Sequence, residues 1–194
     1  RDLHSFPTRR SSDLVQLYTA DVTRTLPVNG RYTDAQRRVY EVVLAAQEAG
    51  IAACRAGNGF LDPHRAAIRV IAEFLAEIGV LPCSVEETLA DDGGYHRRWM
   101  VHGTSHHLGL DVHDCAAARR ERYRDAELLP GMVITVEPGL YFKSTDLLVP
   151  EEYRGIGVRI EDDILITEGD PENLSASLPR ASRDVEAWLA RLKG

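Results

Sequence analysis

The sequence predicts an α+β fold, with helices packed on one side of a mostly antiparallel sheet. Residues 33–90 keep the apolar spacing of helices, whereas the chain from Met100 onward has short apolar stretches separated by Gly and Pro. The length of 194 residues and an apolar content of 44% suit one hydrophobic core. Helices that precede strands in this way favour α+β over an alternating α/β order.

The first thirty residues fall into two parts. Residues 1–14, "RDLHSFPTRRSSDL", have no helical or strand period and no apolar signal segment. We interpret them as a foreign tail resembling a translated adapter remnant; a disordered native tail is the alternative. Residues 15–30 alternate and are rich in Val, Thr and Tyr, which predicts one or two strands. The domain is therefore expected to occupy residues 15–194.

Two long helices are predicted in the first half of the chain. Thr33 and Gln36 form a capping box at the start of a helix over about 34–55. A second helix should follow over 62–78, with Asp62 as its N-cap.

Shorter elements complete the prediction. A third helix is expected after residue 84 and a closing helix over 180–192. Strands are expected over 100–104, 109–114, 132–137 and 156–167.

Composition excludes several kinds of partner. A net charge of -7 and a pI near 5.5 argue against nucleic acid, whose phosphates need basic surfaces. No apolar run reaches the roughly 20 residues that a membrane span needs. The three scattered cysteines, Cys54, Cys83 and Cys115, fit reduced thiols in a cytoplasmic protein.

Four metal-type side chains lie on predicted strands or at their ends: Asp21, His106, Glu137 and Glu161. Each alone has an ordinary explanation, such as a surface position, a turn, a solvated acidic run or a structural histidine. A carboxylate in a buried strand is costly unless it is paired or binds a metal, and several together repel one another. In combination the four therefore favour a metal site.

This ligand set predicts metal-assisted hydrolysis. Carboxylates and one imidazole suit Mn²⁺, Co²⁺ or Zn²⁺, and carboxylates can bridge two ions roughly 3.5–4 Å apart. A bridging water would be acidified from a pKa of about 15.7 towards neutrality, which provides a hydroxide nucleophile. Other histidines near the site could stabilise the tetrahedral intermediate.

Four segments together resemble the pita-bread metallopeptidases, and within them the aminopeptidase P branch. They are "YTADVTRTLPVNG", "VHGTSHHLGLDVHD", "PGMVITVEPGLYF" and "YRGIGVRIEDDILITEGDPENLS". The resemblance implies two pseudo-symmetric αβ halves around a curved sheet and a centre of two divalent ions, usually Mn²⁺. It also implies a homo-oligomeric parent that removes the N-terminal residue from peptides with proline in second position.

The resemblance also implies a role for each site residue. Asp21 and Glu161 would bridge the two metals, and His106 and Glu137 would bind the same one of them. The remaining residues would act on the substrate or support the ligands. His102 and His113 would contact substrate and stabilise the transition state, Arg159 and Tyr141 would support ligands and substrate, and His107 would be a pocket wall.

The chain departs from the family at one ligand. The family's first aspartate should lie eleven residues before Asp21 in an L-x-D-x-G strand, where this chain has Arg10. One metal would then keep only Asp21 and Glu161 and bind weakly. The N-terminal domain of the family is also absent, so we expect a truncated catalytic domain with little or no activity.

Four alternatives remain open. Prolidase cleaves Xaa-Pro dipeptides with the same centre, although "TRTLPVNG" and "VPEEYRGIGVRIEDD" are more like aminopeptidase P. Methionine aminopeptidase shares the ligands but fits "LDVHD" less well. A non-catalytic binding module on the same fold would normally lose ligands, and an unrelated α+β domain is the last possibility.

Overall fold

The computed structural model describes residues 18–115 and 117–193, so the expected foreign tail and Arg10 lie outside the described residues. These described residues form four α-helices: α1 (Asp34–Ala52), α2 (Asp62–Glu77), α3 (Val85–Leu89) and α4 (Ser182–Lys193). The strands are β1 (Val133–Val136), β2 (Gly139–Tyr141), β3 (Gly157–Arg159), β4 (Asp162–Leu165) and β5 (Glu172–Asn173). Three short 3₁₀ helices are η1 (Tyr95–Arg98), η2 (Arg120–Arg122) and η3 (Glu151–Tyr153).

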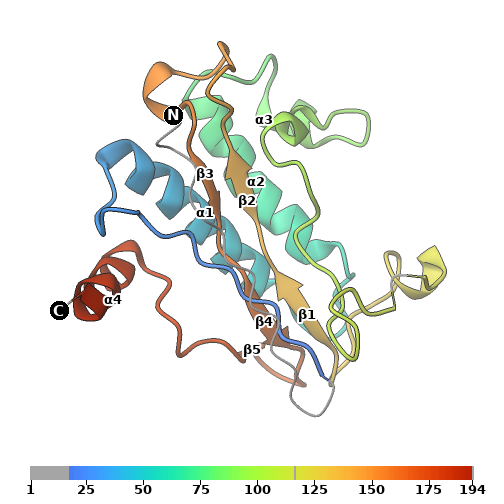
Figure 1. Cartoon of the computed structure of the whole chain (residues 1–194). Coiled ribbons are helices and arrows are strands. Elements are labelled where there is room, and N and C mark those ends of the chain that lie inside the picture. The colour runs from blue at the N-terminus through green and yellow to red at the C-terminus, as the bar shows by residue number, and fades with distance from the viewer. Residues whose placement is uncertain (1–17, 116, 194) are drawn as a thin grey trace.

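Helices α1 and α2 pack side by side behind the strands (Figure 1). The predicted capping box of Thr33 and Gln36 is present at α1. The predicted N-cap of α2 was wrong: the helix already begins at Asp62, Leu61 is its N-cap, and the Asp62 carboxylate instead accepts from the Gly59 backbone N–H at 2.8 Å.

The apolar core fills the space between these helices and the strands. Val39, Val43, Ile71 and Leu75 are fully buried and belong to a cluster that also contains residues of β2 and β3. A second, smaller cluster lies around β1 and β4. The helices therefore cover one face of the strands and leave the other face available for a site.

Strands β1 to β4 form one long antiparallel ribbon with an interruption in the middle, and β5 pairs antiparallel with the end of β4. β1 pairs with β4, and β2 pairs with β3. The register is the same on both sides of the interruption, since Val136 pairs with Asp162 and Gly139 with Arg159. Continued through the gap, this register places Glu137 opposite Glu161.

Two extended segments flank this ribbon, one on each side. The backbone of residues 104–107 bonds to β1, where the Thr135 N–H donates to the His106 carbonyl oxygen at 2.9 Å. On the other side Thr23 and Glu161 exchange backbone hydrogen bonds of 3.3 and 3.0 Å. Four segments that are distant in sequence therefore lie next to one another across the sheet.

Several strand predictions were wrong. Residues 18–30 and 109–114 contain isolated bridges or turns in place of regular strands, residues 100–104 contain only bends and irregular backbone, and residues 156–167 divide into β3 and β4. In the first of these segments, threonine hydroxyls take part in the bonding: the Thr19 hydroxyl donates to the Gly109 carbonyl at 3.0 Å and the Thr25 hydroxyl to the Arg159 carbonyl at 2.9 Å. None of the helices in the described ranges is long and apolar enough to cross a membrane.

Candidate metal centre

The four predicted ligands lie on the four adjacent segments of the sheet. His106 comes from the segment beside β1, Glu137 from the interruption after β1, Glu161 from the interruption before β4, and Asp21 from the segment beside Glu161. All four are buried, with exposed fractions of 8% or less. The structure thus brings together residues separated by up to 140 positions in the sequence.

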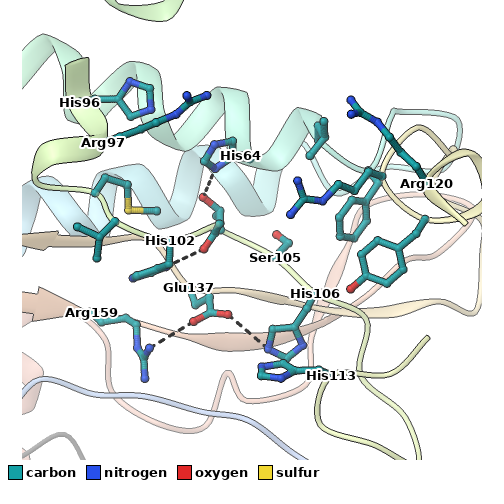
Figure 2. Close-up of a pocket in the computed structure, with 18 of the residues that line it drawn as sticks. His64, His96, Arg97, His102, Ser105, His106, His113, Arg120, Glu137 and Arg159 are labelled. Carbon is teal, nitrogen blue, oxygen red and sulfur yellow. Dashed lines mark hydrogen bonds and ion pairs between the residues drawn. The ribbon is translucent and has the colours of Figure 1, made fainter. Parts of the chain in front are cut away.

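The side chains converge on one point. Ligand-type atoms of Asp21, His106 and Glu161 all lie within 4.8 Å of one another. His106 Nε2 is 3.7 Å from Asp21 Oδ2 and 3.4 Å from Glu137 Oε1. Figure 2 shows Glu137 between His106 and Arg159, with its Oε2 in an ion pair with Arg159 and its Oε1 facing His106 Nε2.

The orientation of His106 suits a metal ligand. Its Nδ1 lies 3.1 Å from the carbonyl oxygen of His107, which can only accept a hydrogen bond. Nδ1 therefore carries the proton in the neutral ring, and the lone pair of Nε2 faces the carboxylates. A hydrogen bond from the second ring nitrogen to a carbonyl is the usual arrangement in metal-binding histidines.

Burial and mutual repulsion perturb the pKa values of these groups. Burial and the charge of Glu161 raise the pKa of Glu137 to about 7, against the smaller lowering effects of His106 and Arg159. Burial lowers the pKa of His106, but contact with Asp21, the His107 carbonyl and the charge of Glu137 together raise it above its ordinary value. A cation among these carboxylates would relieve their repulsion.

Arg159 and Thr23 hold the two glutamates from the side. Arg159 Nη1 is 3.5 Å from Glu137 Oε2, and its Nε is 3.8 Å from Glu161 Oε2. The Thr23 hydroxyl donates to Glu161 Oε2 and lies 3.2 Å from Arg159 Nη2. These contacts orient the glutamate oxygens, and Thr23 was not among the site residues predicted from the sequence.

Asp163 is a further buried carboxylate at this centre that the sequence analysis did not select. It accepts from the Asp21 backbone N–H at 3.3 Å, and burial raises its pKa to about 7, helped by the charges of Glu161 and Asp21. Side chains two residues apart in a strand share a face, so Arg159, Glu161 and Asp163 all point the same way. In the sequence, the spacing of two residues between Glu161 and Asp163 was the signal that could have identified Asp163.

The residues present fit divalent metal ions. Carboxylate oxygens with one imidazole nitrogen are the donor set that Mn²⁺, Co²⁺ and Zn²⁺ accept. The convergence of ligand atoms within 4.8 Å and the Nε2 lone pair directed at the carboxylates supply a buried site for such an ion. The alternative that "EDD" is a solvated acidic turn is excluded, since Glu161, Asp162 and Asp163 are all buried.

A cavity of about 1050 Å³ opens beside this centre (Figure 2). Five of the predicted site residues line it: His102, His106, His113, Glu137 and Arg159. The His113 ring packs perpendicular to the His106 ring, with centroids 4.4 Å apart. A peptide in the cavity would therefore contact both the candidate ligands and the predicted substrate histidines.

His102 and Tyr141 form a pair at the cavity wall. His102 Nδ1 is 2.7 Å from the Gly103 carbonyl oxygen, and its Nε2 is 2.7 Å from the Tyr141 hydroxyl. Because a carbonyl only accepts, Nδ1 donates and Nε2 of the neutral ring accepts from the phenol. Tyr141 thus fixes the orientation of His102.

His107 lies outside the ligand cluster, as predicted. Its ring stacks on Phe60 with centroids 5.0 Å apart and meets Tyr123 edge-on at 4.9 Å. Phe60 and Tyr123 line the cavity but His107 does not, so the predicted role of His107 as a pocket wall is not confirmed.

The proteins that this chain resembles in sequence are metallopeptidases. The family model of metallopeptidase family M24 matches residues 14–168. Xaa-Pro aminopeptidase 1 of Streptomyces coelicolor is 58% identical over 194 aligned positions, which cover 95% of this chain and 39% of that protein. Xaa-Pro aminopeptidase of Escherichia coli is 46% identical, with 89% of this chain and 38% of that protein covered.

Solved structures show the same fold. The Pseudomonas aeruginosa aminopeptidase PepP matches with a TM-score of 0.85 and 37% identity, over 92% of this chain and 40% of that one. A zinc-substituted E. coli aminopeptidase P in complex with product matches with a TM-score of 0.81 and 44% identity, over 91% and 39%. The chain spans about two fifths of the length of these relatives. By its sequence match, its fold and its cluster of buried carboxylates and imidazole, the chain belongs to metallopeptidase family M24.

Proposed function

We propose that this chain carries the metal-binding part of an Xaa-Pro aminopeptidase, which removes the N-terminal residue from peptides whose second residue is proline. The observation that supports this is the convergence of Asp21, His106, Glu137 and Glu161 beside a cavity large enough for a peptide. The relatives named above are Xaa-Pro aminopeptidases, and they are about two and a half times as long as this chain. The activity is therefore proposed for the whole protein.

The proposed centre holds two divalent ions, with Mn²⁺ as the physiological metal. Asp21 and Glu161 would bridge the ions, while His106 and Glu137 would bind the same one. When bound, such ions acidify water and polarise the scissile carbonyl group. One of the two sites would be weak, because Arg10 stands where the family's first aspartate is expected.

The chain's own residues would orient the substrate and stabilise charge. His113 lines the cavity beside His106, where it could donate to the oxyanion of a tetrahedral intermediate. His102 also lines the cavity and would contact the substrate, with its ring held by the Gly103 carbonyl and the Tyr141 hydroxyl. Arg159 keeps the glutamate oxygens in place through its ion pairs. We also propose a cytoplasmic location and a homo-oligomeric whole protein.

The test is a peptide assay with added Mn²⁺. This 194-residue chain should cleave an Xaa-Pro tripeptide far more slowly than the E. coli Xaa-Pro aminopeptidase, because one metal lacks a ligand and the cavity lacks the rest of the protein. Any cleavage it shows should be abolished by Glu161→Ala. Turnover equal to that of the E. coli enzyme would contradict the missing-ligand interpretation, and cleavage of the Xaa-Pro dipeptide alone would favour prolidase.

A further inference from the structure

A buried network of polar side chains lies behind the candidate ligands, on the opposite face of the ribbon. Its centre is Asp162, which is fully buried. Neighbouring side chains of a strand point to opposite faces, so Asp162 points away from the Glu161 carboxylate and towards α1. There Gln47, also fully buried, donates from Nε2 to Asp162 Oδ2 at 2.9 Å.

Arg24 is the main partner of Asp162, and every N–H of its guanidinium has an acceptor. Its Nη2 donates to Asp162 Oδ1 at 2.6 Å and to the Leu178 carbonyl at 3.3 Å. Its Nη1 donates to the carbonyls of Thr23 at 3.0 Å and Glu161 at 2.7 Å, and its Nε donates to the Pro179 carbonyl at 2.9 Å. All five donors of the rigid planar group are therefore used.

The rest of the network extends to β1 and to the chain before α4. Ser175 donates from its hydroxyl to Asp162 Oδ1 at 2.6 Å, and Arg180 Nε is 3.7 Å from Asp162 Oδ2. Gln47 also donates to the carbonyl of Val136 at 3.3 Å. Val136 directly precedes Glu137, so the network contacts the backbone next to a third candidate ligand.

We propose that Arg24 and Asp162 are positioning residues that set the spacing of the ligand-bearing segments. Arg24 joins the segment of Asp21 to that of Glu161 through one rigid fork, and Gln47 extends the connection to the strand of Glu137. This inference rests on the proposed metal centre. A buried ion pair adds little net stability compared with well-packed apolar side chains, whereas a fully bonded fork fixes the geometry of the segments that it contacts.

The test measures metal binding in the whole 194-residue chain, without relying on activity. Arg24→Lys keeps the charge but offers three donors from a single atom and cannot span both carbonyls and the carboxylate. The dissociation constant for Mn²⁺, measured by calorimetry, should rise by roughly 10- to 100-fold. The visible spectrum of the Co²⁺-loaded variant should also change, because the ligand spacing changes, while circular dichroism should still show a folded chain.

Asp146→Asn is the matched control. Asp146 is also buried and paired, with Arg98 Nε at 2.9 Å and the Trp99 indole N–H at 3.1 Å, but the hydrogen bonds and ion pair of its side chain reach none of the ligand segments. This variant should lose stability and yet bind Mn²⁺ as the wild type does. Equal weakening of Mn²⁺ binding in Asp146→Asn and Arg24→Lys would mean that general destabilisation is the cause, and would overturn the proposal.

Ser175→Ala is the gentler second variant, which decides the question if Arg24→Lys does not fold. It removes one hydrogen bond to Asp162, and Mn²⁺ binding should weaken by roughly three- to tenfold. If Arg24→Lys is folded and binds Mn²⁺ as tightly as the wild type, the proposed positioning role is refuted, although the metal centre is not. If Arg24→Lys is unfolded, the same result in Ser175→Ala refutes the positioning role. No Mn²⁺ binding by the wild type would instead refute the proposed metal centre on which the inference rests.

Discussion

Three consecutive acidic residues take two different roles because a strand alternates its faces. Glu161 and Asp163 point to the candidate centre, where Asp163 accepts from the backbone of Asp21. Asp162 points the other way and pairs with Arg24. Glu161 could be predicted as a metal ligand from the sequence, because the segment around it resembles a family motif. The role of Asp162 depends on Arg24, which lies 138 residues away, and so no local pattern could indicate it.

The raised pKa values of two carboxyls predict how the metal-free chain responds to pH. The pKa of Glu137 is about 7 against an ordinary 4.5, and that of Asp163 is about 7 against 3.8. The folded state binds these protons more tightly than the unfolded state, so stability falls as the pH rises. Their destabilising contribution is absent below about pH 4 and complete above pH 7.

Glu137→Gln tests this dependence in the presence of EDTA. At pH 8 the variant should be more stable than the wild type by an amount on the order of 2 kcal/mol, because no charge is buried at that position. At pH 4 the difference should vanish. When EDTA is replaced by Mn²⁺ at pH 8, the wild type should become the more stable of the two, since only the wild type keeps all four ligands. A stability difference that does not change with pH in EDTA would contradict the account.

At the scale of elements, the sequence predicted helices better than strands. The spacing of apolar residues and the capping box predicted α1 well, with an end three residues earlier than expected. The segment beside β4 was predicted as a strand from its Thr and Val content, but its described residues 18–30 form isolated bridges at Tyr18 and Thr23 and contacts made by side chains. Regular strands need continuous partners, and the partner is determined by tertiary structure.

Close packing of α1 against β1 supports the ribbon that carries Glu137. A Cβ added at Gly50 of α1 would lie 2.9 Å from Val136 Cγ1 and 3.3 Å from the Pro63 carbonyl oxygen. Gly50→Ala should therefore destabilise the chain by about 1–2 kcal/mol, even though alanine favours a helix by about 1 kcal/mol. Urea denaturation measures the change, and a stabilised variant would show that the helix and strand are less closely packed.

At the scale of the molecule, the candidate centre exists only because four distant segments become neighbours. The ribbon register places Glu137 opposite Glu161, and the flanking segments add His106 on one side and Asp21 on the other. Residue types and family motifs predicted these four positions from the sequence. Their distances, and the contribution of Thr23 and Asp163, follow from sheet order, which the sequence does not state.

Metal binding to the intact chain tests the central claim most directly. After incubation with Mn²⁺ and removal of unbound metal, elemental analysis of the wild type should find at least one retained ion per chain. His106→Ala should lose about 100-fold or more in affinity, since it removes the imidazole whose Nε2 lies 3.7 Å from Asp21 Oδ2 and 3.4 Å from Glu137 Oε1. A wild type that retains no ion, or a His106→Ala variant that binds Mn²⁺ with unchanged affinity, would contradict the account.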